Sequence, residues 1–303
     1  MEKTAKNFMK YKYVYVIISL GIAIFGIVYG LSTGYKFDVD FNGGTKIQAD
    51  INEEFNNVEV EKIVKDITNT SVLVQKTTGG NNSVSITTDA LDVETLDRVV
   101  STLKARYENI SEPSTRNVQP SYGKELFESA ILALVIAVVL ILLYITVRFK
   151  TMGATAALSA IAALIHDVLF IIGVYGIIKF PINSTFIAVI LTIIGYSIND
   201  TIVIYDRIRE NRKKITRSSN VDETVNLSIS QCLGRTIMTS LTTVAAVLIV
   251  FIFAVLNNQE VLMQFSLPLI IGVIVGTYSS LFVASPLWIL FTNISNKIFK
   301  SKK

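Results

Sequence analysis

The stretch TIIGYSINDTIVIYDRIRENRKK, Thr192 to Lys214, decides the fold, because an apolar run passes into a basic cluster without any loop signal. Counting from Asn183 to Arg207 gives about 25 residues, which at about 1.5 Å per residue cross roughly 30 Å of hydrocarbon. The stretch therefore predicts a membrane-spanning helix that ends in a basic segment.

Asp200 lies inside this predicted span. It comes before Arg207 by two helical turns, which places it about 10 Å from the boundary, too deep for its short side chain to reach bulk water. A carboxylate at such a depth costs about 2.5–3.5 kcal/mol on insertion scales. We therefore expect Asp200 to be protonated, paired or facing a water-filled cavity, and we treat it as a functional candidate.

The composition predicts a polytopic α-helical membrane protein. The chain has 303 residues, of which 51% are hydrophobic and 17% are charged, and its mean hydropathy is +0.51. Soluble globular domains are less apolar and more charged. The single cysteine, Cys232, excludes an internal disulfide, and in its basic surroundings it fits a reducing compartment or an ordinary small side chain.

Six apolar runs predict six transmembrane helices, at residues 14–31, 125–147, 154–178, 183–206, 236–256 and 262–294. The first is interpreted as an uncleaved anchor, in preference to a signal peptide, because no clean small-residue cleavage site follows it. Residues 1–13 and 295–303 are a predicted cytoplasmic N-terminus and tail. Residues 207–235 are a predicted cytoplasmic loop, in which Asp222 to Leu233 forms an interfacial helix with Val225 and Ile229 on its apolar face.

The distribution of lysine and arginine predicts the orientation. Basic residues gather before the first span, after the second, between the fourth and fifth, and after the sixth, whereas the two short turns on the opposite side contain only Lys179. Because cytoplasmic loops carry the excess of basic residues, we expect both termini in the cytoplasm of a cell-membrane protein. The segment between the first two spans then lies outside the cytoplasm.

Residues 32–122 have the polar, β-branched composition of a small folded domain. Phe37 to Ile51 alternates like a strand that Gly43 and Gly44 interrupt, and a hairpin is predicted around residues 79–82. Two amphipathic helices and a closing strand near Arg116 to Val118 complete the order β, α, β, β, α, β. This order predicts a ferredoxin-like α+β domain. No metal cluster, catalytic triad or phosphate loop is evident in it, and we expect no cofactor, no metal and no nucleic-acid partner.

Polar side chains on the fourth and fifth spans predict a proton relay. Tyr196, Asn199 and Asp200 fall near one face of the fourth span. Arg235 begins the fifth span on the same side of the membrane, so the two groups could meet. The fifth span continues with hydroxyl groups at helical spacing, namely Thr236, Thr239, Ser240 and Thr243. A buried carboxylate near an arginine can exchange a proton when its access alternates between the two faces.

Simpler roles stay open for these residues. Arg235 stands where the charge bias already requires a cation, so it also fits a snorkelling anchor. The hydroxyl stripe also fits helix packing. His166 and Asp167 of the third span lie near mid-membrane, and their side chains point about 100° apart. They fit either a coupling to the relay or a structural hydrogen bond to a neighbouring helix.

The sixth span contains a ridge of small residues at steps of four, namely Gly272, Gly276, Ser280 and Ala284. Such a ridge lets helices approach closely. It predicts helix packing, and the helix that it faces could belong to this chain or to a partner subunit.

Five motifs resemble the SecF family of the Sec translocase accessory complex, within the resistance-nodulation-division superfamily. They are FDVDFNGGT at 37–45, ALIHDV at 163–168, GYSINDTIVIYDRIREN at 195–211, RTIMTSLTT at 235–243 and TYSSLFVASPL at 277–287. The first motif contributes Phe37, Asp38, Asp40, Gly43 and Gly44. Asn42 departs mildly from the family, where threonine is common. The length indicates a separate SecF chain in preference to a SecD–SecF fusion.

The resemblance implies that Asp200 is the membrane carboxylate of a proton path and that Arg235 is its basic partner. It also implies a SecD partner, contact with the SecYEG channel and with an unfolded polypeptide, and a role in late, gradient-driven protein export. The coupling ion, H⁺ or Na⁺, stays open. A small-molecule efflux subunit and a structural assembly factor are the alternative functions. A hydrolytic enzyme is not expected, because the spans offer no identifiable nucleophile with a base.

Overall fold

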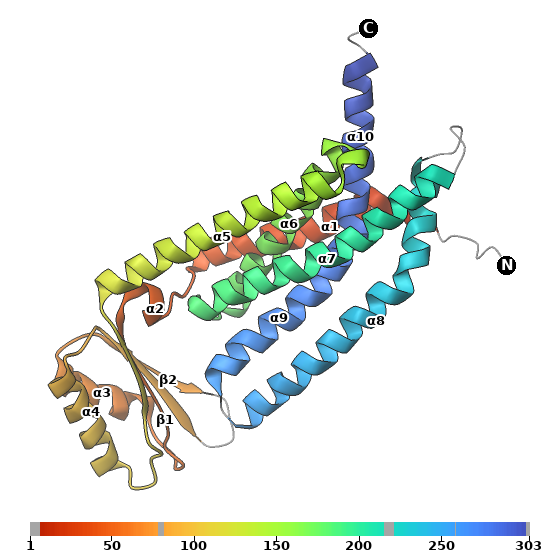
Figure 1. Ribbon diagram of the computed structural model, residues 1–303. Coiled ribbons are helices and arrows are strands. Elements are labelled where there is room, and N and C mark those ends of the chain that lie inside the picture. Colours follow the sequence, from red (N-terminus) through yellow and green to blue (C-terminus); the bar gives the residue numbers. More distant parts are fainter. Residues whose placement is uncertain (1–6, 78–81, 215–220, 258, 301–303) are drawn as a thin grey trace.

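The computed structural model describes residues 7–77, 82–214, 221–257 and 259–300. A long helical bundle carries a small α+β domain at one end, here called the domain end, and Figure 1 shows the first turns of α1 and the last turns of α10 at the opposite, basic end. Within these residues, six helices are long and apolar enough to cross a membrane by length and composition. This confirms the prediction of a six-span helical membrane protein.

The bundle helices are α1 (Lys12–Thr33), α5 (Pro120–Arg148), α6 (Ala154–Ile178), α7 (Ser184–Lys214), α8 (Val221–Leu256), α9 (Glu260–Ser279) and α10 (Ser285–Lys300). Short 3₁₀ turns, η1 (Phe8–Tyr11) and η2 (Lys150–Met152), precede α1 and α6. Helices α5 and α8 expose many apolar side chains, such as Leu140 and Ile249. Hydrocarbon is the solvent that suits such a surface. The candidate span Glu260–Ser295, which begins with α9 and continues into α10, is the most buried of the six, and α9 contacts α6, α7 and α8.

Helices α1 and α6 pack through facing glycines. A Cβ atom built on Gly26 would lie 2.5 Å from the carbonyl oxygen of Gly173, and one built on Gly176 would lie 2.5 Å from the carbonyl oxygen of Gly26. Backbone atoms cannot move aside as a flexible side chain can, so only glycine fits at these positions. The close approach brings α1 within hydrogen-bonding reach of α6.

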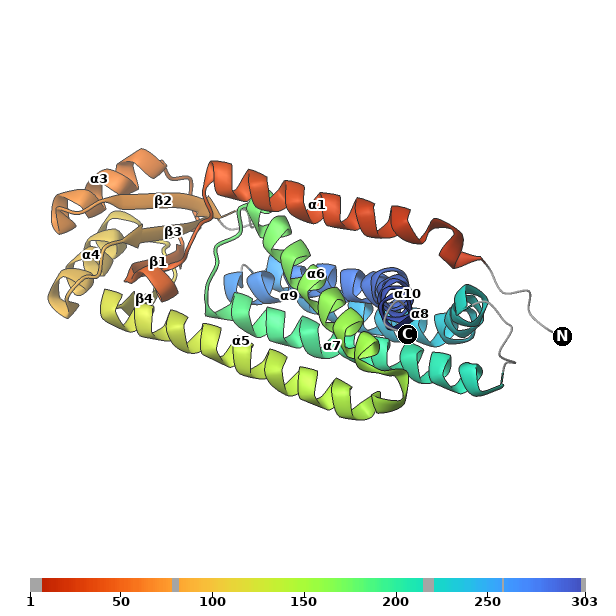
Figure 2. The ribbon, with the colours of Figure 1, turned by 90° about the horizontal axis from the view of Figure 1, so that it is seen from above.

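The α+β domain is a four-stranded antiparallel sheet covered by two helices. Its strands are β1 (Gly44–Asp50), β2 (Val72–Thr77), β3 (Ser83–Thr88) and β4 (Ser114–Val118), in the order β2-β3-β1-β4. Helices α3 (Asn57–Thr68) and α4 (Val93–Arg106) lie on one side of the sheet (Figure 2). The domain has its own apolar core, which includes Ile47, Val64, Ile86, Val99 and Leu103. Residues 79–81 of the predicted hairpin turn lie outside the described residues.

The predicted strand over Phe37 to Ile51 is wrong in its first half. Val39–Asn42 forms a helical turn, α2, whose first N–H group donates to the Asp38 carboxylate at 2.9 Å. The chain then turns at Gly43 and Gly44, whose φ angles of 74° and 127° favour glycine, and the strand begins there. The domain also ends earlier than residue 122, because α5 already begins at Pro120.

The predicted separate interfacial helix over Asp222 to Leu233 is also not observed. The segment forms the first turns of α8, which continues without a break into the fifth span. Val225 and Ile229 are fully buried in the same core cluster as residues of α7. The prediction of an amphipathic segment is correct, but its apolar face packs against other helices of the protein and not against the membrane surface. A salt bridge of 2.7 Å from Lys12 to Asp222 also ties this segment to α1.

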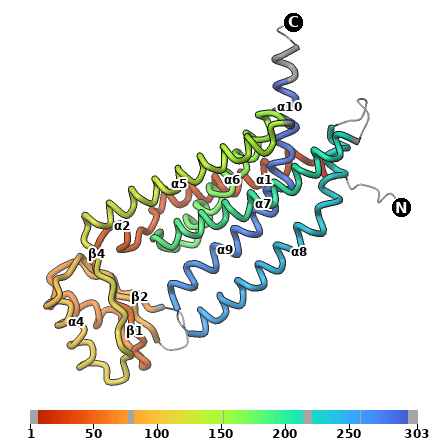
Figure 3. Tube along the Cα trace, viewed as in Figure 1, coloured from red at the N-terminus to blue at the C-terminus, as the bar shows by residue number. Residues whose placement is uncertain are grey.

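The predicted sixth span, 262–294, is two helices joined by a π-helical turn, η3 (Ser280–Ala284). Pro286 follows the turn, and because proline lacks a backbone N–H group, the regular hydrogen-bond ladder cannot continue through it. Figure 3 shows α10 leaving the direction of α9 after this turn. The bend lies beside the polar residues described below.

The glycine contact between α1 and α6 gives the first testable prediction. Gly26→Ala should destabilise the protein by about 1–3 kcal/mol, the usual cost of overpacking, which we would measure by thermal unfolding in detergent. Gly21→Ala in the same helix is the matched control, since a Cβ atom there meets nothing within 4 Å. Equal stability of the two variants would contradict the packing described here.

Candidate functional site

Asp167 of α6 is the most highly connected carboxylate between the membrane helices. It is 0% exposed. Its Oδ2 atom accepts hydrogen bonds from Ser197 Oγ of α7 at 2.6 Å and from Ser279 Oγ of α9 at 2.8 Å. Three helices therefore meet at a single side chain. A carboxylate in a low-dielectric interior requires such donors, because an unsatisfied charge there is very costly.

His166 extends these contacts to a fourth helix. Its Nδ1 atom lies 3.1 Å from Asp167 Oδ1, and its Nε2 atom lies 2.6 Å from Ser19 Oγ of α1. When Asp167 is ionised it can only accept, so Nδ1 carries the hydrogen and Nε2 can accept from Ser19. Adjacent residues do point in different directions, as expected, and between them they join α1 to α7 and α9.

A polar row continues along α7 toward the basic end. Ser280 Oγ donates to the Ser197 carbonyl at 3.0 Å and lies 2.9 Å from Thr201 Oγ1. One turn further, Tyr205 Oη donates to the Ala284 carbonyl at 3.0 Å and lies 2.8 Å from Ser159 Oγ of α6. Ser197, Thr201 and Tyr205 follow each other at steps of four, so one face of α7 contributes the whole row.

Asp200 lies one turn from Ser197 and is only 4% exposed. Among the described residues, its Oδ2 atom has no hydrogen-bond partner. A buried carboxylate oxygen without a donor is unusual in a folded protein and marks a site for a proton, a water molecule or an ion. Asp200 therefore differs from Asp167, whose two oxygens both have partners.

Arg235 lies at the depth of Asp200 without forming an ion pair with it in the described part of the chain. Helices α7 and α8 are antiparallel, and Cys232 Sγ of α8 lies 4.0 Å from the carbonyl oxygen of Val203 of α7. Arg235 comes three residues after Cys232, and Asp200 comes three residues before Val203. Because the two helices run in opposite directions, both offsets lead to the same depth. The Arg235 side chain instead lines a cavity of about 520 Å³ with Arg207 and Lys213. The expected contact is therefore absent in this conformation.

The other residues of the predicted relay have separate surroundings. Asn199 is exposed, and Thr239 and Thr243 donate to carbonyl groups of their own helix. Ser240 Oγ lies 2.5 Å from Thr277 Oγ1 of α9. Within the described residues, the hydroxyl groups of Tyr196 and Thr236 are buried without a partner. The structure thus brings Ser240 to α9 but does not bring Asn199 or Thr239 to Asp200.

The ridge of small residues faces α7 of this chain. A Cβ atom on Gly272 would overlap Ile193, and one on Gly276 would lie 3.0 Å from Ser197 Cβ. Ser280 and Ala284 continue the ridge into η3, where they contact Ser197 and Tyr205. The small residues therefore let Ser279 and Ser280 approach α7 and Asp167.

The motif at 37–45 lies at the other end of α7. Phe37 bridges to Ile182, and Asp40 Oδ2 accepts from Ser184 N at 3.1 Å and from Ser184 Oγ at 2.5 Å. Burial alone would raise the pKa of Asp40, but the hydrogen bonds from Ser184 and the nearby Arg116 outweigh it and hold this pKa below its usual value. Asp40 and Asp200 are separated by about 24 Å along the helix, so this motif is distinct from the intramembrane groups.

Sequence reasoning missed the two serine partners of Asp167 and the polar row that continues along α7. Ser159, Ser197, Thr201, Tyr205 and Ser279 were not among the candidates, although the steps of four along α7 were visible in the sequence. Serine and threonine are common in membrane helices as packing residues, so their spacing alone does not single out a site. Their role follows from the neighbouring helix that each one faces.

Six candidate spans, a small α+β domain and ionisable side chains buried between the helices define a polytopic membrane protein with an intramembrane polar core. A family model described as "Protein export membrane protein SecD/SecF, C-terminal" matches residues 98–294. The chain belongs to this SecD/SecF family, and it is similar to SecF proteins along nearly its whole length.

Individual relatives agree with this assignment. "Protein translocase subunit SecF" of Borreliella burgdorferi is 35% identical over 306 residues, which cover 96% of this chain and 98% of that protein. "Protein translocase subunit SecDF" of Bacillus subtilis is 35% identical over 92% of this chain but only 37% of that protein. The crystal structure of SecDF from Thermus thermophilus superimposes with a TM-score of 0.85 at 30% identity, covering 96% of this chain and 39% of that chain.

The shared acceptor at Asp167 gives the second prediction. Asp167→Leu removes the acceptor of the Ser197 hydroxyl and one of the two acceptors of the Ser279 hydroxyl, which should cost about 2–4 kcal/mol of folding stability. Asp167→Asn retains an amide oxygen as acceptor and should lose less. Thermal unfolding in detergent measures both variants, and equal losses would show that the hydrogen bonds do not contribute.

Asp40 gives a third prediction, on pH dependence. Its pKa is lower in the folded protein than in the unfolded chain, so its ionised form stabilises the fold at neutral pH, and this contribution is lost as the pH falls through the folded value. Asp40→Asn should be about 1–3 kcal/mol less stable at pH 7, and the difference should shrink below about pH 4. Asp66→Asn, on the exposed face of α3, is the control; a pH-independent difference would contradict this.

Proposed function

We propose that this chain is an accessory subunit of the Sec protein translocase that, together with SecD, couples the proton gradient to late stages of protein export. Relatives named as translocase subunits support the assignment to this pathway. The observation that carries the coupling is the buried Asp200 carboxylate, which has an oxygen without a partner among the described residues. Ionisable groups at such depth are rare in membrane helices and mark ion paths.

SecD is the partner that we infer. In the Bacillus subtilis and Thermus thermophilus SecDF chains, the matching region occupies 37% and 39% of the length, which is consistent with a SecD-type region in the same polypeptide. The exposed apolar surface of α5 and α8 is available for lipid and for such a subunit. We propose the SecYEG channel and the translocating unfolded polypeptide as the other partners, and no role as an enzyme.

The orientation that we propose places both termini and the basic end in the cytoplasm, as the distribution of basic residues requires. The α+β domain then lies outside the cytoplasm. Its antiparallel strand order β2-β3-β1-β4, with helices after β1 and β3, supports a ferredoxin-like assignment. The emerging polypeptide would meet this domain first.

Proton binding at Asp200 would cancel a buried charge between α7 and its neighbours. One elementary charge that crosses 100 mV gains about 2.3 kcal/mol, enough to shift a balanced two-state equilibrium by roughly fiftyfold. Arg235 at the same depth would pair with the carboxylate when Asp200 is ionised and leave it when Asp200 is neutral. The spacing of α7 and α8 would change with this pairing and tilt the outer domain.

Two other functions remain as alternatives. A small-molecule efflux subunit would need a substrate-binding region, for which one small α+β domain offers little room. A structural assembly factor would not need Asp200. Proton flux across reconstituted vesicles separates the assembly factor from the other two functions, and export of a secretory precursor separates the translocase subunit from the efflux subunit.

Asp200→Asn provides the fourth prediction. In vesicles that contain the full translocase with SecD, this variant should keep ATP-driven export but lose the part that the proton gradient stimulates, because the amide cannot ionise. Asp97→Asn, on the exposed face of α4, should behave like the unmodified protein. Undiminished gradient stimulation in Asp200→Asn would refute the assignment, and replacing the proton gradient by a sodium gradient identifies the ion.

A further inference from the structure

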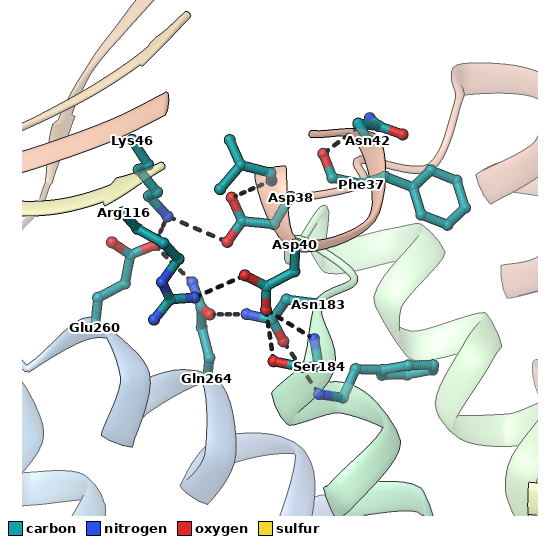
Figure 4. Close-up of polar contacts among 12 residues, drawn as sticks. Phe37, Asp38, Asp40, Asn42, Lys46, Arg116, Asn183, Ser184, Glu260 and Gln264 are labelled. Atoms are coloured by element: carbon teal, nitrogen blue, oxygen red, sulfur yellow. Dashed lines mark hydrogen bonds and ion pairs between the residues drawn. The ribbon is translucent and has the colours of Figure 1, made fainter. Parts of the chain in front are cut away.

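A cluster of charged and amide side chains joins the α+β domain to the ends of two membrane helices (Figure 4). We call it the junction cluster. Its members come from α2 and the residue before it, from β1 and β4, and from the domain ends of α7 and α9. They are Asp38, Asp40, Lys46, Arg116, Asn183, Ser184, Glu260 and Gln264.

Lys46 connects the sheet to α9. Its side chain is only 10% exposed, and its Nζ atom lies 2.8 Å from Oε1 of Glu260, the first residue of α9, and 3.4 Å from Asp38 Oδ2. A lysine ammonium is rarely buried unless it is paired. This pair therefore fixes the start of α9 to the middle of the sheet, because β1 is an interior strand.

Asp40 connects the sheet to α7. Its Oδ2 atom accepts from the backbone and hydroxyl of Ser184, the first residue of α7, and its Oδ1 atom accepts from Arg116 Nη1 of β4 at 3.0 Å. A carboxylate at a helix N-terminus is also favoured by the helix dipole. The low pKa of Asp40 keeps this connection ionised at physiological pH.

The two connections are linked to each other. Asn183 Nδ2 donates to Gln264 Oε1, and Gln264 Nε2 donates to Glu260 Oε1 at 2.6 Å. The domain ends of α7 and α9 are thus joined directly, and each is also joined to a different strand. Since β1 and β4 are neighbouring antiparallel strands, a shift of α9 along α7 would pull on two adjacent strands in different directions.

We propose that the junction cluster transmits relative movement of α7 and α9 to the α+β domain, with Lys46 and Glu260 as its positioning residues. The inference rests on the proposed function, since it needs a movement to transmit. The same two helices supply Ser197 and Ser279 to Asp167, about 20 Å and about 28 Å from their domain ends. A rearrangement around the intramembrane carboxylates therefore has a route to the sheet through α7 and α9.

The chemistry of the cluster fits transmission better than simple adhesion. Apolar contacts of equal area would hold the domain as firmly, whereas buried ion pairs fix one geometry and penalise sliding. A cavity of about 250 Å³, lined in part by Asp38, Lys46, Arg116 and Glu260, lies beside the pairs. Among the described residues, Glu260 Oε2 is buried without a partner, so the carboxylate has room and a free acceptor for rearrangement.

The first experiment measures transmission independently of export. Spin labels at Val58 on α3 and Leu256 at the end of α8, both exposed, report the distance between the domain and the bundle in lipid nanodiscs with SecD, at pH 5 and pH 8, in a Cys232→Ser background. We expect a pH-dependent distance change in the parent protein and at least a threefold smaller change in Lys46→Met and Glu260→Gln. Lys104→Met, which removes an exposed ion pair with Glu112, is the matched control.

Two outcomes of this experiment would overturn the proposal. One is a distance change in Lys46→Met and Glu260→Gln equal to that of the parent protein. The other is a parent protein whose domain does not move at all, because the cluster would then have nothing to transmit, even if gradient-driven export is observed. Failure of the proposed function gives a different result, namely no gradient stimulation of export by the parent protein.

The second experiment separates a mechanical role from a purely electrostatic one. In the same background, Lys46→Cys with Glu260→Cys should reduce gradient-stimulated export at least fivefold and leave ATP-driven export in place. A short bis-maleimide that bridges the two cysteines should restore at least half of the stimulation. Lys104→Cys with Glu112→Cys is the control pair. Full stimulation before cross-linking, or none after it, would overturn the proposal.

Discussion

The membrane part of this protein depends on satisfying one buried carboxylate, Asp167. Hydrocarbon offers no hydrogen-bond donors, so the donors must come from the protein itself. The serines of α7 and α9 and the neighbouring His166 of α6 supply them. Each donor has to approach within about 3 Å, which fixes how close the helices are. The arrangement of α6, α7 and α9 follows from this requirement more than from apolar packing, which is weakly directional in lipid.

Small residues make this approach possible. Gly272 and Gly276 place α9 against α7, and the facing glycines of α1 and α6 bring Ser19 to His166. The π-helical turn then presents Ser280 to α7 immediately after Ser279 has bonded to Asp167. The close backbone approach therefore makes the side-chain hydrogen bonds possible. The glycine ridges and the π-helical turn provide this approach, and the polar row depends on it.

The sequence allowed the spans and the domain order to be predicted, because hydrophobic length and period are local properties. Val225 and Ile229 show the limit of such local prediction. Their spacing predicted an apolar face, but whether lipid or protein covers this face depends on α7 and η1. Asp200 was found because a carboxylate in an apolar run is conspicuous. Ser197 and Ser279 were missed because serine is common in membrane helices as a packing residue. Nothing in the local sequence distinguishes a hydrogen-bond donor to Asp167 from such a residue.

The two buried aspartates, Asp167 and Asp200, have different surroundings, and the difference suits them to different roles. Changing the charge of Asp167 disturbs donors on two other helices and His166 on its own helix at once, so this residue is suited to hold the bundle together. Asp200 has an oxygen without a partner among the described residues and an arginine at its own depth that is not yet in contact. A change of its charge disturbs few existing contacts and can create a new one. We therefore infer that Asp200 is the group whose charge changes, while Asp167 holds α7 and α9 in a fixed register. This register is what allows a rearrangement at Asp200 to reach the junction cluster.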